Sequence, residues 1–195
     1  MHIIVTGGLG HIGSHLILEL VKNNSKFKIS VFDNLSTNRY PTLFQFAKHK
    51  KINFIEKDLS KYNIDGYIKS ADLVIHLAAI TDAQSSILIP EKIKNNNLKT
   101  TKNIIVSCAK FKTKIIFIST TSVYGSQNSL VDENCKKSEL KPQSPYAFYK
   151  LKEEKIIFNS LKKNNFNGVI LRFGTIYGFS IGMRFHTAVN KFCWQ

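Results

Sequence analysis

The stretch Thr6-Gly7-Gly8-Leu9-Gly10-His11-Ile12-Gly13 largely decides the fold of this 195-residue chain. It follows a short β-rich apolar run at residues 2–5 and precedes residues 14–21, where apolar side chains recur at helical spacing. Strand, glycine-rich turn and helix in this order are the setting that a dinucleotide-binding loop requires. The glycines allow a tight turn and a close backbone approach to a pyrophosphate, and the helix N-terminus offers free N–H groups.

Asp33 supports this interpretation from a second strand. It ends an apolar run at residues 27–32, about 20 residues past the glycine loop. A carboxylate at this place can accept hydrogen bonds from the ribose hydroxyls of an adenine dinucleotide, and it would repel a 2′-phosphate. The sequence therefore predicts NAD rather than NADP, although Arg39 lies close enough along the chain to weaken that preference.

Tyr146 and Lys150 form a Tyr-x-x-x-Lys pair, which is informative only together with the residues around it. With 7 Tyr and 28 Lys plus Arg, roughly one such pair is expected by chance. This pair opens a helical stretch after Pro145, with Ser144 as a candidate N-cap, and residues four apart share a helix face. A cation about 4 Å from a phenol supplies a Coulomb energy large enough to bring a tyrosine pKa from about 10 to about 7, although desolvation of the phenolate opposes it. The pair thus predicts a tyrosine that exchanges protons.

Eight motifs stand in the order typical of extended short-chain dehydrogenase/reductases, and they cover nearly the whole chain. They occupy residues 6–13, 33–36, 58–59, 76–79, 96–101 with 103, 119–125, 145–150 and 171–174. The chain resembles the NAD-dependent epimerase/dehydratase branch of that family and is UDP-glucose 4-epimerase-like. The resemblance implies an α/β fold with a Rossmann-type doubly wound parallel sheet, NAD as the cofactor and a nucleotide sugar as the substrate.

The same resemblance implies a role for each site residue. Thr120 would hydrogen-bond the reacting sugar oxygen, Tyr146 would be the acid/base, and Lys150 would bind the nicotinamide ribose and lower the tyrosine pKa. The residues implied to contact NAD are Gly7, Gly10, His11, Ile12, Gly13, Asp33, Asn34, Ser36, Asp58, Leu59, Leu77, Ala78, Ala79, Asn96, Tyr146, Lys150 and Phe173.

The residues after Thr120 favour one reaction of the family. Related dehydratases resemble each other in an Asp-Glu pair directly after the threonine, and related decarboxylases carry a nearby Glu, whereas this chain has Thr121 and Ser122. An epimerase needs only reversible hydride transfer at a sugar carbon, so epimerisation is favoured over dehydration. Thr81 and Thr175 replace the lysine and asparagine of UDP-galactose-type epimerases. The sugar therefore stays open among uronic acids, heptoses and other deoxysugars.

Apolar runs predict the order of strands and helices. Strands are expected at residues 2–6, 27–32, 52–56, 73–76, 115–119 and 168–171, and helices at 13–22, at 89–110, bent or begun near Pro90, and at 146–163. Alternation of this kind predicts a parallel sheet covered on both faces, forming an NAD-binding domain over residues 1–178. The polar stretch 126–142 is interpreted as a surface loop beside the active site.

Residues 179–195 are interpreted as the start of a smaller substrate-binding domain. A helical pattern over 183–195 places Phe185, Val189, Phe192 and Cys193 on one apolar stripe, which is expected to be exposed. Because members of the family continue well beyond this point, the chain is expected to be truncated and to bind NAD without useful turnover alone. The alternatives to an epimerase are then a truncated NAD-binding remnant or a half that needs a complementing partner domain. A homodimer is a further expectation.

The formal net charge of +15 raises the hypothesis of nucleic-acid binding. The lysines are scattered without a dense basic arm, so a solvated surface is favoured and a basic nucleic-acid-binding module is the last alternative. The 3 cysteines show no metal spacing and cannot all pair, which fits a cytoplasmic location. No apolar run approaches membrane-spanning length, no metal site is predicted, and His76 is interpreted as structural.

Overall fold

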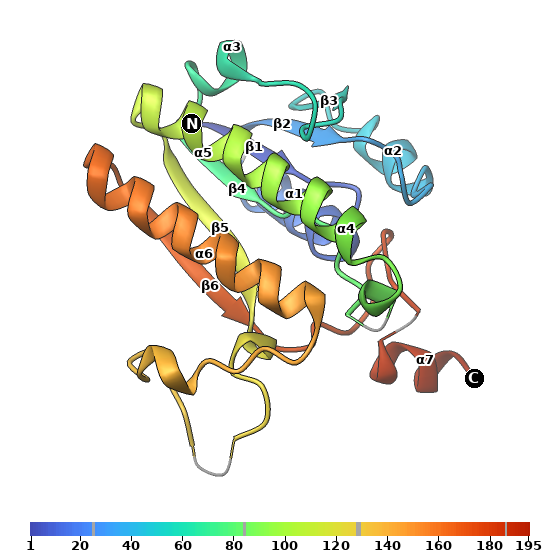
Figure 1. The fold of residues 1–195 in the computed structure, drawn as a ribbon. Helices are drawn as coiled ribbons and strands as arrows, with labels where there is room; N and C mark the ends of the chain where they lie inside the picture. The colour runs from blue at the N-terminus through green and yellow to red at the C-terminus, as the bar shows by residue number, and fades with distance from the viewer. Residues whose placement is uncertain (25, 84, 128–129, 186) are drawn as a thin grey trace.

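The computed structural model describes residues 1–24, 26–83, 85–127, 130–185 and 187–195. Within them, a six-stranded sheet has only parallel neighbours, in the order β3-β2-β1-β4-β5-β6 (Figure 1). The strands are β1 (His2–Thr6), β2 (Lys28–Asp33), β3 (Ile52–Glu56), β4 (Leu73–His76), β5 (Lys114–Thr120) and β6 (Gly168–Phe173). This order confirms the predicted Rossmann-type doubly wound sheet.

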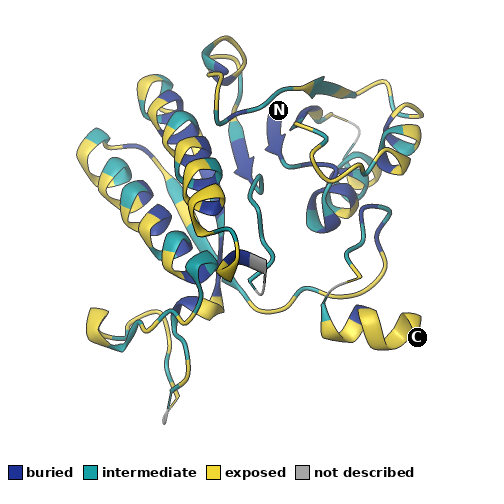
Figure 2. Cartoon of the chain, turned by 45° about the vertical axis from the view of Figure 1, so that its right-hand side comes forward, coloured by how far each residue is buried: buried dark blue, intermediate teal, exposed yellow. Residues whose placement is uncertain are grey.

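Helices cover both faces of the sheet. The long helices α5 (Lys99–Phe111) and α6 (Pro145–Asn164) pack side by side on one face, and α1 (His11–Asn23) packs on the other. Their outer sides are exposed and their inner sides are buried (Figure 2). The other helical segments are α2 (Pro41–Phe46), α3 (Asp65–Ile68), α4 (Pro90–Ile93), α7 (Ala188–Trp194), the 3-10 turns η1 (Ser85–Ile87), η3 (Thr121–Val123) and η4 (Lys137–Glu139), and the π-helical turn η2 (Lys94–Leu98).

The predicted helix over residues 89–110 is three consecutive segments in the structure: α4, η2 and α5. Pro90 takes the first position of α4, where a missing N–H breaks no helical hydrogen bond. In the π-helical turn, the Asn97 amide accepts from the Ile80 N–H at 2.9 Å and donates to the Ile80 carbonyl at 3.0 Å. Turns of this kind occur mostly inside α-helices and frequently lie at functional sites. Here the turn fastens α5 to the loop that follows β4.

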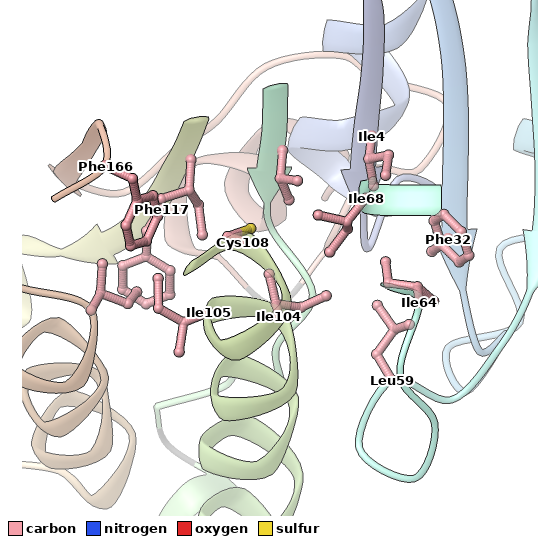
Figure 3. Packing of buried hydrophobic residues seen from close by; sticks show 13 residues of the cluster. Ile4, Phe32, Leu59, Ile64, Ile68, Ile104, Ile105, Cys108, Phe117 and Phe166 are labelled. Atoms are coloured by element: carbon pink, nitrogen blue, oxygen red, sulfur yellow. The ribbon is translucent and has the colours of Figure 1, made fainter. Parts of the chain in front are cut away.

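Two apolar clusters fill the space between the sheet and its helices. Neighbouring residues of a strand point to opposite faces, so Ile4 packs in the cluster of α5 and α6, whereas Ile3 and Val5 pack in the cluster of α1. Burial on both faces is typical of a parallel sheet. Figure 3 shows the first cluster, which includes Phe32, Ile68, Ile104, Ile105, Cys108 and Phe117.

Ser144 begins α6 as predicted. Its Oγ accepts a hydrogen bond from the Ala147 N–H at 3.1 Å, and Pro145 occupies the first helical position. An N-cap of this kind contributes about 1 kcal/mol to helix stability. The cap fixes where the helix starts, and so it fixes which face carries Tyr146 and Lys150.

The C-terminal segment differs from the prediction, because the helix expected over 183–195 begins only at Ala188. Before it, the Gly182 N–H donates to Ser14 Oγ at 3.1 Å and the Arg184 N–H donates to His11 Nδ1 at 3.4 Å. These backbone groups bind α1 and are therefore not used in helical hydrogen bonds. The apolar side chains of α7 are exposed as expected (Figure 2), with Phe192 and Trp194 each 74% exposed.

The loops and cysteines add three observations. The predicted surface loop at 126–142 contains η4, while residues 128 and 129 lie outside the described part. The cysteines at positions 108, 135 and 193 are all free thiols. Among the described residues, the helices are too short or too polar to cross a membrane. The division into domains at residue 178 stays a prediction.

Candidate active site

A cavity of about 540 Å³ lies at the carboxyl ends of the strands. Ligands of doubly wound sheets bind where the strand order reverses, which is between β1 and β4 here. Every residue predicted for the site lines this cavity. The lining residues are Gly7, Gly10, His11, Ile12 and Gly13 after β1; Asp33, Asn34 and Ser36 at the end of β2; Asp58 and Leu59 after β3; Leu77, Ala78 and Ala79 after β4; Asn96 in η2; Thr120 at the end of β5; Tyr146 and Lys150 in α6; and Phe173 at the end of β6.

Gly7 shows why the first loop needs glycine. Its φ is +68°, and a Cβ there would lie 2.7 Å from the backbone of Ala78, so a side chain would clash with the loop after β4. The next helix, α1, begins at His11 with Gly10 as its N-cap. Because glycine has no side chain to bind the first N–H groups of the helix, these donors can bind an anion.

Asp33 is the last residue of β2, and its carboxylate contacts both the loop after β1 and the loop after β2. Its Oδ2 accepts from the Leu9 N–H at 3.2 Å, and its Oδ1 accepts from the Leu35 N–H at 3.0 Å. Burial raises the pKa of Asp33, although these hydrogen bonds and the nearby Arg39 guanidinium act in the opposite direction. Arg39 also lines the cavity. A carboxylate and a guanidinium therefore share the end of the cavity formed by the first two loops.

His76 has the structural role that the sequence suggested. Its ring is buried between two threonine hydroxyls, with Nδ1 2.7 Å from Thr6 Oγ1 and Nε2 3.0 Å from Thr101 Oγ1. Burial and the Lys150 charge lower the pKa of His76 to about 3, so the ring is neutral at neutral pH. Thr6 Oγ1 also accepts from the Ala78 N–H at 3.2 Å, which holds the loop after β4. The described residues contain no cluster of side chains suited to a metal ion.

Lys150 and Thr120 approach the cavity from α6 and β5. Lys150 is 3% exposed, and its Nζ donates to the Ile118 carbonyl at 3.1 Å. Thr120 Oγ1 accepts from the Ser122 N–H at 3.2 Å and donates to Ser122 Oγ at 3.1 Å. The two groups are thus fixed at the ends of neighbouring elements, where they can meet one ligand.

The pKa of Tyr146 corrects one expectation. Burial raises it, and this effect exceeds the lowering by the Lys150 and Arg184 charges, while the Glu153 carboxylate raises it further. Lys150 acts in the predicted direction, but the net shift is upward. Desolvation of the phenolate has a stronger effect on the pKa than the Lys150 charge. That charge is also partly offset by the Glu153 carboxylate, whose Oε2 lies 3.4 Å from Lys150 Nζ.

Arg184 is a cavity residue that sequence reasoning missed. Its Nη1 donates to Thr81 Oγ1 at 2.5 Å, and its backbone carbonyl accepts from Asn190 Nδ2 at 2.8 Å. One signal was available, because Arg39, Arg172 and Arg184 are the only arginines among 28 Lys plus Arg residues. Arginine presents several donors in a fixed plane and is preferred where an anion or a carboxylate is bound. Thr187, Lys57 and Asp82 line the same cavity and were also missed.

The chain belongs to the NAD dependent epimerase/dehydratase family, whose family profile matches residues 3–193. It is 32% identical to a Bacillus subtilis protein described as an uncharacterized UDP-glucose epimerase, YtcB, over 100% of this chain and 63% of that protein. It is also 32% identical to dTDP-D-glucose 4,6-dehydratase of Dictyostelium discoideum, over 90% of this chain and 44% of that enzyme.

Solved structures agree with this assignment. The structure of UDP-glucuronic acid 4-epimerase from Bacillus cereus in complex with UDP-glucuronic acid and NAD is similar to this one, with a TM-score of 0.89 and 31% identity. The similarity covers 97% of this chain and 61% of the Bacillus cereus enzyme. The chain therefore spans less than two thirds of the length of each of these relatives.

Proposed function

We propose that the chain forms the cofactor-binding domain of an NAD-dependent nucleotide-sugar epimerase, which acts by transient hydride transfer at a sugar carbon. One observation carries the proposal: Thr120, Tyr146 and Lys150 line the same cavity as the glycine loop and Asp33. Names of relatives support it, since the similar proteins include epimerases and a solved complex with a UDP-sugar and NAD.

The residues of the cavity fit NAD. The turn at Gly7 has no room for a Cβ, because the backbone of Ala78 lies against it. The N–H groups at the start of α1 have no side-chain cap and suit a pyrophosphate. Asp33 and Lys150 both line the cavity, where Asp33 would accept from the adenosine ribose hydroxyls and Lys150 would bind the nicotinamide ribose. When bound, NAD supplies the hydride acceptor.

The protein's own residues would transfer the proton of the reacting sugar hydroxyl. Tyr146 would accept the proton of the reacting sugar hydroxyl when its carbon is oxidised, and it would return that proton to the oxygen when the carbon is reduced from the other face. Thr120 hydrogen-bonds that oxygen. Burial raises the pKa of Tyr146, and the charges of Lys150 and Arg184 oppose that rise by favouring its proton-accepting form. Thr121 and Ser122 lack the carboxyl groups that loss of water would use, which favours epimerisation over dehydration.

A second candidate is a half-enzyme that needs a partner domain or a homodimer for turnover. The exposed Phe192 and Trp194 of α7 favour it, because apolar side chains gathered at a surface mark sites of interaction. The cytoplasmic location inferred from the free cysteines stays a prediction.

The test combines calorimetry with a product assay. Purified chain is titrated with NAD and is then incubated with NAD and a panel of UDP-, GDP- and dTDP-sugars. NAD binding with formation of an epimer supports the proposal, and accumulation of a 4-keto-6-deoxy sugar would instead indicate a dehydratase. NAD binding without any product would support the partner-dependent half. Failure to bind NAD would contradict both candidates.

A further inference from the structure

Glu153 is a buried carboxylate beside the proposed active site. It lies three residues after Lys150 in α6 and is 0% exposed. Its Oε2 lies 3.4 Å from Lys150 Nζ, and the lysine side chain is itself only 4% exposed. Burying two charges is unfavourable unless they pair and their other polar atoms are satisfied. The other contacts of Glu153 therefore bear on the role of the Lys150–Glu153 ion pair.

Glu153 also ends a chain of hydrogen bonds that starts at the loop after β4 and passes through the end of β1. Thr101 Oγ1 donates its proton to Glu153 Oε1 at 2.5 Å, so it can only accept from His76 Nε2, 3.0 Å away. A neutral His76 that donates through Nε2 must accept through Nδ1, which lies 2.7 Å from Thr6 Oγ1. Thr6 Oγ1 accepts in turn from the Ala78 N–H. Every donor in the chain points toward the Glu153 carboxylate, as a negative charge at its end requires.

The ammonium of Lys150 is consequently fixed before any ligand arrives. Besides Glu153, it meets the Ile118 carbonyl at 3.1 Å and lies 4.4 Å from the ring centroid of Phe117. Glu153 also affects Tyr146: its charge raises the pKa of the phenol, whereas the charge of Lys150 lowers it. The two charges of the buried pair thus have opposite effects on the tyrosine.

We propose that Glu153 is a positioning residue, which fixes Lys150 at the wall of the cavity and offsets the lysine's charge at Tyr146. Its role in turnover rests on the proposed function. The charged groups that face Tyr146 are Lys150 and Glu153 from α6 and Arg184 from the segment after β6, and Arg184 interacts with Asp82 of the loop after β4.

The experiment follows the titration of Tyr146 in the full chain. Tyrosine is labelled with carbon-13 in the ring, and the Tyr146 signal is assigned by its loss in Tyr146→Phe. Glu153→Gln keeps an oxygen that accepts from Thr101 but removes the charge. The expected result is a titration midpoint of Tyr146 at lower pH than in the unchanged chain. An unchanged or higher midpoint in a folded Glu153→Gln variant would overturn the proposal.

Glu154→Gln is the matched control. Glu154 is the next residue of α6 and also has a buried carboxylate, but it pairs with Arg172 at 2.7 Å. Its loss is expected to leave the Tyr146 midpoint in place, and an equal shift in both variants would overturn a specific role for Glu153. Should Glu153→Gln not fold, Glu153→Asp draws the carboxylate away from Lys150, with a smaller shift expected in the same direction. A folded Asp variant without a shift would also overturn the proposal.

Calorimetry with NAD separates this inference from the proposed function. If the chain does not bind NAD but the Glu153 variants shift the Tyr146 midpoint, the proposed function fails and the charge relationship stands. If the chain binds NAD and the midpoint does not move, the inference fails alone.

Discussion

Arg184 Nη1 lies 2.5 Å from Thr81 Oγ1, although 103 positions separate the two residues in the chain. The contact joins the segment after β6 to the loop after β4 and forms one wall of the cavity. Thr81 stands where the resemblance to UDP-galactose-type epimerases implies a lysine. In this structure the Arg184 guanidinium supplies a cation beside Thr81 from a distant segment of the chain.

Arg184→Met should move the titration of Tyr146 to higher pH. The guanidinium lowers the pKa of the tyrosine, and its loss leaves the raising effects of burial and Glu153 less opposed. The measurement is the pH dependence of the tyrosine ring signal or, in an active preparation, of the rate of NADH formation. Lys162→Met, which removes an exposed charge near the end of α6, is the control and should leave the midpoint unchanged. A shift to lower pH in Arg184→Met would contradict the assignment.

Lys150→Met should destabilise the fold as well as impair the site. It leaves the fully buried Glu153 carboxylate without its cation, and breaking a buried ion pair in this way costs about 3–5 kcal/mol of unfolding free energy. The double variant Lys150→Met/Glu153→Gln should recover most of that loss, because no charge is left unpaired. Urea denaturation of the two single variants and the double variant measures the coupling. Simple additivity of the two single effects would speak against a coupled pair.

His76 should make the stability depend on pH. Its pKa in the folded chain is about 3, below the ordinary value of 6.5, so between these values the unfolded chain takes up a proton that the folded chain does not. Stability is therefore lost as the pH falls from about 6.5 toward 3, by up to about 5 kcal/mol in total. His76→Gln should flatten this slope when urea denaturation is repeated from pH 7 to pH 5, whereas His15→Gln, at an exposed position of α1, should not.

Strand positions could be predicted because buried parallel strands are nearly continuous apolar runs. β6 nevertheless extends two residues past its predicted end at Leu171, because Arg172 and Phe173 pair with the end of β5, a contact that no local pattern signals. α2 and α3 contain 6 and 4 residues, which is shorter than the window of about 11 over which a helical period can be recognised. Their positions depend on packing and not on periodicity.

The candidate site divides in the same way. Some of its residues belong to local sequence patterns: the glycine-rich loop, the carboxylate at the end of β2 and the Tyr-x-x-x-Lys pair. The residues of all three patterns line one cavity. In the sequence, Glu153 is one more charge on a polar helix, and its hydrogen-bond partner Thr101 lies 52 positions away. Arg184 likewise has a distant partner, Thr81. Residues whose role is set by distant partners leave little trace in a single sequence.

Asp33 should favour NAD over NADP. Its carboxylate lines the cavity. There it would accept from the ribose hydroxyls and would repel a 2′-phosphate, so calorimetry should show tighter NAD binding. Asp33→Ser should weaken NAD binding by about tenfold to a hundredfold, the effect of about 1.5–3 kcal/mol for hydrogen bonds to a charged group. With Arg39 still present, the preference over NADP should narrow. Equal or tighter NADP binding by the unchanged chain would refute the role of Asp33.

The same carboxylate should give NAD binding a pH dependence. Burial raises the pKa of Asp33, so the folded chain protonates this group at a higher pH than an exposed aspartate would. A protonated carboxyl accepts fewer hydrogen bonds from the ribose. NAD affinity should therefore decline as the pH falls through this raised pKa, and the decline should be absent in Asp33→Ser.

Tyr146→Phe should abolish proton exchange while leaving the cofactor bound. The hydroxyl is the only group that the substitution removes, and loss of a general acid/base lowers a rate by about 10²- to 10⁴-fold. NAD affinity should change little, because the glycine loop, Asp33 and Lys150 are untouched. The measurement is NADH formation in a single turnover, with whichever nucleotide sugar the product assay identifies, beside calorimetry with NAD. A near-normal rate in the Phe variant would remove Tyr146 from the chemistry, and a large loss of NAD affinity would instead assign the tyrosine to cofactor binding.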